Sequence, residues 1–151
     1  MHTTGETVFG HKFGFIKKPG NCDIDLLYIG WSTYQEGLEK HKGEDALIEL
    51  DIDGNKGNIL IPLVSTYNLA GISTLAIFTN FIVTEYFINL IKESNKLKLT
   101  FKSPEEMLNK LDIQTESFNL SGFTDAYQQA YKQCNQLLHL AAPIVPTKTG
   151  Q

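Results

Sequence analysis

The two cysteines of this 151-residue chain lie near opposite ends of its apolar sequence. Cys22 opens an apolar run at residues 22–29, and Cys134 lies in the apolar stripe of an amphipathic segment at residues 123–138. A disulfide between them would close a loop of about 112 residues, and the chain-entropy model values such a cross-link at roughly 4–5 kcal/mol. It would fasten the first long strand to the last helix. We therefore expect Cys22 and Cys134 to be bridged, which indicates an oxidising compartment.

Two other states of the cysteines stay open. If both were reduced they would be core residues, because a free cysteine packs like a small hydrophobe. If either were a nucleophile, it would need a lowered pKa and a neighbouring base. The histidines at positions 11, 41 and 139 are scattered, and none lies in a recognisable catalytic context. The sequence thus favours a protein that is not an enzyme without deciding the matter.

Size and charge restrict the class of protein. With 42% apolar and 20% charged residues, the chain is expected to fold as one domain over residues 1–151, with an ordered core at 7–139 and flexible tails at 1–6 and 140–151. The formal charge is −4, and all 13 basic residues are lysines. An acidic chain repels nucleic acid, and without arginine it lacks the bidentate groups that hold phosphate. We expect no nucleic-acid partner.

The location of the protein has two interpretations. No apolar stretch is long enough to span a bilayer as a helix, because polar residues interrupt each one within about ten positions. The start, Met-His-Thr-Thr-Gly-Glu, has neither the basic nor the apolar region of a signal peptide, which taken literally favours the cytoplasm. The expected disulfide favours the periplasm or secretion, with Met1 replacing a removed signal peptide. We expect export and keep the cytoplasm as the alternative.

Strand patterns dominate between the tails. Residues 45–53 alternate between apolar and acidic side chains, residues 54–57 form a turn, and the apolar pattern resumes at 58–64, which predicts a hairpin. Pro62 lacks the donor that a ladder needs and places its strand at an edge or a bulge. Residues 123–138 carry apolar side chains at helical spacing. We predict an α+β fold with a mostly antiparallel sheet or sandwich of six to seven strands and a C-terminal amphipathic helix packed on it.

Two Asp-Ile-Asp repeats form the candidate metal site. Asp23 and Asp25 share one face of a strand, because side chains at i and i+2 align. Asp51 and Asp53 do the same on a second strand. If the two strands were neighbours, these carboxylates could bind Ca²⁺, which prefers oxygen ligands, or act as an acid and base pair in hydrolysis. The other interpretation is a solvated sheet face that ends in an Asp-Gly-Asn turn.

Aromatic side chains are plentiful, with nine Phe, six Tyr and one Trp. Phe13, Trp31 and Tyr34 stand in or directly after the first two strands. They are candidates for a surface that receives a partner protein, since exposed aromatic patches often bind proteins. The alternative interpretation is packing in the core.

Residues 118–134 resemble the end of a known family. The block reads Phe-Asn-Leu-Ser-Gly-Phe-Thr-Asp-Ala-Tyr-Gln-Gln-Ala-Tyr-Lys-Gln-Cys, a strand followed by a Leu-x-Gly-Phe turn and a helix. It is similar to the ending of small exported bacterial proteins akin to the invasion-associated locus B family. The resemblance implies a β-sandwich-like fold and a location in the periplasm or beyond, and it implies no catalytic residue.

These observations favour a non-enzymatic, exported α+β domain that binds another protein, as an inhibitor, an immunity factor or an accessory surface factor. A second interpretation is a carboxylate-based calcium-binding or hydrolytic domain that uses Asp23, Asp25, Asp51 and Asp53. A third is a cytosolic interaction protein of a virus or plasmid with both cysteines reduced. No cofactor other than Ca²⁺ is expected, and the oligomeric state is left open.

The disulfide prediction is tested by the intact mass of natively purified protein after alkylation. Protein that is unfolded without reductant should take up no label, and reduced protein should take up two. Two labels without reductant, in protein made where disulfides can form, would mean free core thiols and would remove the argument for export.

Overall fold

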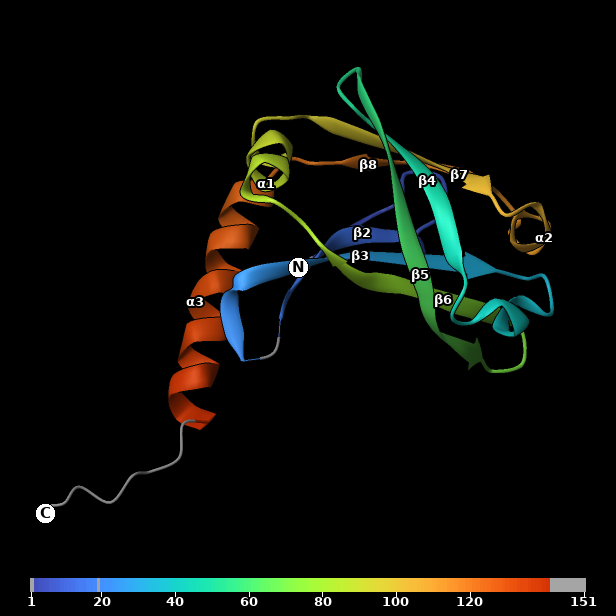
Figure 1. The fold of residues 1–151 in the computed structure, drawn as a ribbon, viewed down its shortest axis with the longest axis horizontal. Helices are drawn as coiled ribbons and strands as arrows, with labels where there is room; N and C mark the ends of the chain where they lie inside the picture. The colour runs from blue at the N-terminus through green and yellow to red at the C-terminus, as the bar shows by residue number, and fades with distance from the viewer. Residues whose placement is uncertain (1, 19, 142–151) are drawn as a thin grey trace, which may run out of the picture.

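The computed structural model describes residues 2–18 and 20–141, with side chains described up to residue 137. One antiparallel sheet of eight strands dominates it, in the order β1-β2-β3-β6-β5-β4-β7-β8 (Figure 1). The strands are β1 (His2–Thr4), β2 (Lys12–Lys18), β3 (Asn21–Thr33), β4 (Asp45–Ile52), β5 (Asn55–Leu69), β6 (Ser73–Ile82), β7 (Lys96–Ser103) and β8 (Thr115–Asn119). The helices are the 3₁₀ helix η1 (Leu38–His41), α1 (Glu85–Lys92), α2 (Glu105–Leu108) and α3 (Phe123–Ala141).

The sheet curls until its two edge strands meet. Gly5, just after β1, forms a β-bridge with Phe118 of β8. The N–H of Glu6 donates to the carbonyl of Ser117 at 2.9 Å. Strands β1 and β8 therefore close the sheet into a nearly complete barrel, which removes edges that would otherwise expose unpaired backbone groups.

The predicted fold class is wrong in its architecture. The prediction was an α+β sheet or sandwich of six to seven strands, whereas the structure has eight strands in one curled sheet and the helices are a minor part. The reason lies in β5, whose first part pairs with β4 and whose second part pairs with β6. Because β5 belongs to both halves, the strands form one continuous sheet and not two packed sheets. An alternating apolar pattern is the same in a sandwich and in a barrel, so the sequence did not distinguish them.

The hairpin predicted at residues 45–64 is confirmed by β4 and β5. Asp53 and Gly54 form its two-residue turn with φ of 50° and 93°, as such a turn requires. Pro62 is followed at once by a register shift between Leu63 and Ser65. The prediction that Pro62 would lie at an edge or a bulge is therefore confirmed.

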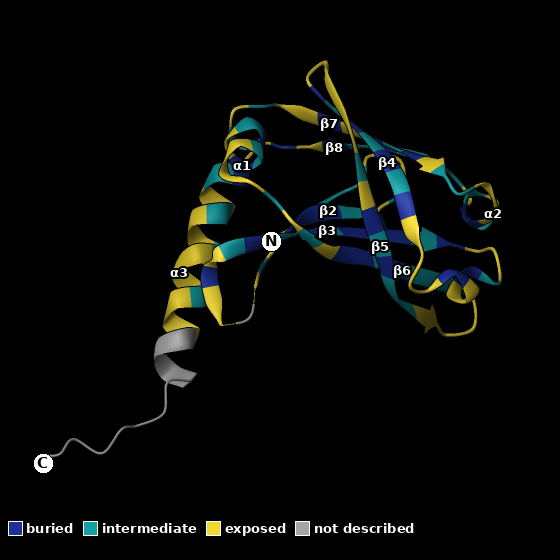
Figure 2. Ribbon diagram, in the orientation of Figure 1, coloured by how far each residue is buried: buried dark blue, intermediate teal, exposed yellow. Residues whose placement is uncertain are grey.

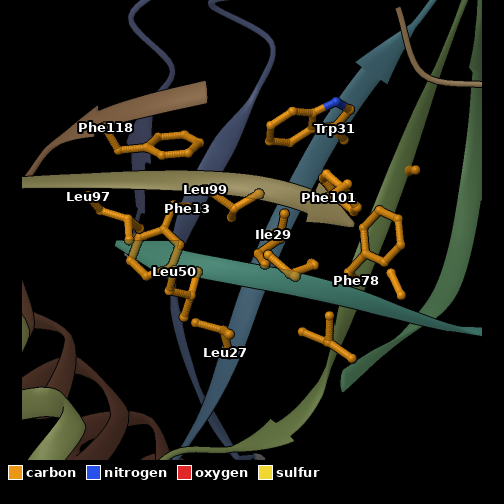
Figure 3. Close-up of a cluster of buried hydrophobic side chains, with 14 of the residues drawn as sticks. Phe13, Leu27, Ile29, Trp31, Leu50, Phe78, Leu97, Leu99, Phe101 and Phe118 are labelled. Carbon is orange, nitrogen blue, oxygen red and sulfur yellow. The ribbon is translucent and has the colours of Figure 1, made fainter. Parts of the chain in front are cut away.

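Aromatic and aliphatic side chains fill the barrel (Figure 3). Trp31 is fully buried, and its Nε1 donates to the Ile113 carbonyl at 2.9 Å. The rings of Trp31 and Phe101 meet edge to face at 4.8 Å between centroids, and Phe78 lies 5.1 Å from Phe101. The pairing of a buried indole N–H with a carbonyl removes the cost of its desolvation.

At both ends of the described residues the chain forms regular structure. Residues 2–4 of the expected N-terminal tail form β1, which pairs with β2. At the other end, α3 runs to Ala141, and residues 142–151 lie outside the described residues. Figures 1 and 2 show α3 at one end of the barrel with much of its surface exposed. Within the described residues, no helix is both long and apolar enough to cross a membrane.

A buried carboxylate holds the N-terminal segment across the closure. Glu116 of β8 is 1% exposed and accepts backbone N–H groups of Thr7 at 2.9 Å, Val8 at 2.8 Å and Ser117 at 2.8 Å. Burial raises the pKa of Glu116, but these donors outweigh burial and hold the pKa below its ordinary value. The ionised carboxylate is thus the form that closes the barrel.

His11 lies beneath this carboxylate with no exposed surface. Its Nδ1 lies 3.3 Å from Glu116 Oε2, and its Nε2 donates to the carbonyl of Ser32 at 3.1 Å. The imidazole stacks on Trp31 at 3.8 Å between ring centroids. Burial lowers the pKa of His11 more than the Ser32 carbonyl and Glu116 raise it. Folding therefore favours the neutral imidazole.

Acid should unfold the protein through these two groups. The pKa of Glu116 is lower in the folded chain, so its stabilisation is complete at neutral pH and is lost as pH falls below about 4.5. The pKa of His11 is also lowered, so protonation of the unfolded chain below about pH 6.5 opposes folding. We expect the free energy of unfolding in urea to fall as pH falls from about 7 to about 4.

The variant Glu116→Gln isolates the carboxylate. It should lower the free energy of unfolding by about 2–3 kcal/mol at neutral pH, because hydrogen bonds to a charged acceptor are replaced by weaker ones. It should also flatten the pH dependence below about pH 5. Wild-type stability of this variant at neutral pH would contradict the role given to Glu116.

Candidate functional site

Cys22 and Cys134 form a disulfide, as predicted, with their Cα atoms 5.8 Å apart. The bridge ties the start of β3 to the exposed helix α3. Side chains of β2, β3 and α3 contact one another on this side of the barrel. The disulfide therefore frames the first of two candidate surfaces.

A triad of charged and phenolic groups lies beside the disulfide. Lys17 of β2 forms an ion pair with Asp25 of β3, with 2.9 Å between Nζ and Oδ1. The Tyr127 hydroxyl of α3 donates to Asp25 Oδ2 at 2.6 Å and accepts from Lys17 Nζ at 3.0 Å. Asp25 is 4% exposed, so its charge is compensated by groups from two other elements. The triad links α3 to both strands.

A pocket of about 370 Å³ opens next to the triad. Two tyrosines contribute to its wall: Tyr127, and Tyr131, whose hydroxyl donates to Asp23 Oδ1 at 2.9 Å. Lys92 of α1 lies with its Nζ 4.5 Å from the ring centroid of Tyr127. The residues that line this tyrosine pocket are Asp23, Asp25, Val83, Glu85, Ile88, Asn89, Lys92, Tyr127 and Tyr131.

The tyrosine pocket is organised as a fixed polar network. Burial raises the pKa of Tyr127, and the hydrogen bond and charge of Asp25 raise it further, far above the usual range for a phenol. Tyr127 is therefore a neutral donor at physiological pH. Such a network holds its side chains in fixed orientations.

The structure does not bring the four predicted metal ligands together. Asp23 and Asp25 lie on β3, and Asp51 lies on β4, which is separated from β3 by β6 and β5 in the sheet. Asp51 accepts the N–H of Gly54 at 2.8 Å within the hairpin turn. Within the described residues, no group of three or more His, Cys, Asp or Glu side chains is placed to hold a metal ion.

Asp53 has a local partner instead. Its two carboxylate oxygens accept the N–H groups of Asn95 at 2.8 Å and Lys96 at 3.1 Å. This side chain joins the β4–β5 turn to the start of β7. It therefore has a structural contact that the Asp-Ile-Asp pattern did not reveal.

The three aromatic candidates for partner binding are placed differently. Phe13 and Trp31 have no exposed surface, so neither is available to a partner in this structure. Tyr34 is 72% exposed, and its N–H donates to Asp112 Oδ2 at 2.7 Å. Of the three, Tyr34 is the side chain presented to solvent.

The second candidate surface is an unpaired edge of β5, which the sequence patterns did not identify. From Asn55 to Pro62, β5 pairs with β4 on one side, whereas its pairing with β6 starts at Leu63. In an antiparallel ladder, alternate residues direct their N–H and C=O to the same neighbour. Leu63 directs both groups toward the β4 side, through Glu44 and Gly43. Counting back from Leu63 two residues at a time, the N–H and C=O groups of residues 61, 59, 57 and 55 also point toward β4.

Lys56, Asn58 and Leu60 therefore direct their backbone groups away from β4. The backbone of Pro62 also points away from β4. Proline has no N–H to donate, and at this position no neighbouring strand among the described residues is present to receive one. In the part of the chain that the structure describes, no strand pairs with this side of residues 55–61. Figure 2 shows the free half of the β4–β5 hairpin largely exposed. We call Lys56–Asn58–Leu60 the open edge.

An apolar groove of about 370 Å³ runs beside the open edge, between the β4–β5 hairpin and α1. Leu50 and Ile52 of β4 line it on one side, and Phe87 and Leu90 line it from α1. Gly57 faces the same side as Leu50, its partner across the ladder. The lining residues are Leu50, Ile52, Asn55, Lys56, Gly57, Asn58, Ile59, Tyr86, Phe87 and Leu90.

Comparison with known proteins supports a likeness of fold. No family model and no curated protein sequence matches the chain. The fold resembles that of invasion associated protein B from Bartonella henselae. That crystal structure superposes with a TM-score of 0.53 at 11% sequence identity, over 87% of this chain and 82% of the other. The match agrees with the resemblance of residues 118–134 at the level of the fold, and invasion associated protein B is a structural relative only.

The triad gives a stability prediction with a matched control. Tyr127→Phe removes the hydroxyl between Lys17 and Asp25 and should lower the free energy of unfolding by about 1.5–3 kcal/mol, the range for hydrogen bonds to charged groups. Tyr131→Phe removes a comparable bond at a residue that is 39% exposed and should cost less than about 1 kcal/mol. Equal losses in urea unfolding would show that burial of Asp25 does not matter.

Proposed function

We propose that this chain is a non-enzymatic, exported protein-binding domain, acting in the periplasm or after secretion. The single observation that carries the proposal is the open edge of β5. Backbone N–H and C=O groups in extended conformation are met fully by the backbone of another extended segment. A polypeptide is therefore the ligand class that this surface fits.

The rest of the architecture supports binding by a rigid scaffold. The Glu116 contacts close the opposite side of the barrel, and the Cys22–Cys134 disulfide holds α3 against β3. A preorganised surface loses little conformational freedom when it binds. The open edge lies beside the gap between the first half of β5 and β6, so an added strand would extend the pairing of the sheet there.

Export rests on two supports. The disulfide is of a kind that persists in oxidising compartments and is rare in the cytosol. The fold resembles that of an invasion associated protein of a bacterium. An accessory surface factor, an inhibitor or an immunity factor would each use a protein-binding domain of this form.

Site-specific photo-crosslinking in the natural host tests the proposed function. A photoreactive amino acid is placed at Leu60, which is 57% exposed on the open edge, and in a control at exposed Glu39 of η1. The Leu60 probe should give a discrete cross-linked polypeptide, found with the exported fraction, and the Glu39 probe should not. Absence of any polypeptide adduct at Leu60, or identical adducts at both positions, would contradict the proposal.

A further inference from the structure

We infer that the open edge receives an extended segment of a partner protein that carries a large aliphatic residue opposite Gly57 and a carboxylate opposite Lys56. The inference rests on the proposed function and specifies the chemistry of its ligand. Three features of the site lead to it: the phase of the unpaired backbone, the space at Gly57 and the row of charges that ends at Lys56.

The backbone phase sets where the partner's side chains point. Lys56, Asn58 and Leu60 offer their N–H and C=O groups to the added strand, so partner residues opposite them lie on the outer face. Gly57 lies between these positions and faces inward. A partner residue opposite Gly57 would therefore direct its side chain into the groove between β4 and α1.

Gly57 leaves space that the fold itself does not fill. Its φ lies outside the left-handed region, and a Cβ built on it would meet no atom within 4 Å. Neither backbone conformation nor internal packing therefore requires glycine here. A glycine inside a strand often marks a bulge, a bend or a site where another backbone approaches closely, and the ladder of Gly57 with Leu50 is regular. The space adjoins Leu50, Ile52 and Leu90, so an aliphatic side chain is the group that would bury apolar surface in it.

Charged side chains alternate in sign across the outer face of three strands, and the row ends at Lys56 on the open edge. Asp51 of β4 lies opposite Lys56 on one side and opposite Lys98 of β7 on the other. Opposite charges on neighbouring strands stabilise a sheet, and like charges destabilise it. A carboxylate on the added strand opposite Lys56 would continue the alternation, and a lysine there would break it. Among the residues that line the groove, Lys56 is the one with a charged side chain.

A second copy of this chain fits the site less well. Antiparallel pairing of two β5 edges about Asn58 would place Ile59 of the copy opposite Gly57, which suits the groove. The same register would place Leu60 of the copy opposite Lys56, which leaves the charge row unfinished. The carboxylate requirement therefore favours a different protein.

The test uses three short acetylated peptides that share one threonine- and valine-rich extended sequence. One contains the pair Ile-Glu in that order, so that antiparallel pairing places Ile opposite Gly57 and Glu opposite Lys56. One replaces this pair by Ile-Lys, and one by Ala-Glu. Binding to the oxidised full-length protein is followed by chemical-shift changes of backbone amides. We expect the Ile-Glu peptide to perturb the amides of Lys56, Asn58 and Leu60, and each altered peptide to bind at least about tenfold more weakly.

Two variants with matched controls test the site on the protein. Gly57→Ile fills the space and Asn58→Pro removes an outward N–H without touching the ladder to β4, so both should abolish binding of the Ile-Glu peptide. Gly57→Ala and Asn58→Thr keep the groove and the donor and should retain it. Thermal unfolding of each variant shows that the fold is intact. Undiminished binding to folded Gly57→Ile or Asn58→Pro would overturn the inference.

Three further results would contradict the inferred ligand. Equal affinity for the Ile-Glu, Ile-Lys and Ala-Glu peptides would overturn the inferred chemistry, as would perturbations confined to the tyrosine pocket. Perturbation of the open edge that depends on protein concentration without peptide would assign the site to a second copy. In each of these cases an adduct at Leu60 from the photo-crosslinking experiment would leave the proposed function standing. Loss of that adduct as well would mean that both have failed.

Discussion

Backbone pairing is the constraint on which this structure depends. A sheet of eight strands must meet the hydrogen-bonding groups of two edges, and this chain does so by bringing β1 and β8 together. The closure is made by few groups, because Glu116 binds backbone N–H groups of the N-terminal segment while His11 and Trp31 stack beneath it. On the side of β5 away from β4, the backbone groups of its first half have no partner strand among the described residues. The surface proposed for binding is this unpaired part of the sheet.

The disulfide and the triad serve a second purpose. Helix α3 has largely exposed side chains, and a helix with so little buried surface gains little from packing alone. The Cys22–Cys134 bridge and the contacts of Tyr127 with Lys17 and Asp25 hold it to β2 and β3. Oxidation therefore stabilises this end of the molecule, which is consistent with a role outside the reducing cytosol.

Local patterns predicted the β4–β5 hairpin, an edge or a bulge for the strand of Pro62, and the disulfide, because each depends on residue types that act within one element or one pair. The barrel could not be predicted in this way. An inward-facing Glu116 conflicts with its apolar strand face until Thr7 and Val8, over 100 positions away, are placed against it. The metal hypothesis assumed that the strands of Asp25 and Asp51 are neighbours, and strand order is a global property that alternation does not encode.

Hydrogen exchange of backbone amides in the free protein tests the central claim most directly. We expect an alternating pattern along the first half of β5: the amides of Lys56, Asn58 and Leu60 exchange rapidly, and those of Gly57, Ile59 and Ile61 are protected by β4. Such alternation requires a strand that is paired on one side and open on the other. Uniform protection of all six amides would mean that the edge is already covered, and it would contradict both the open edge and the function assigned to it.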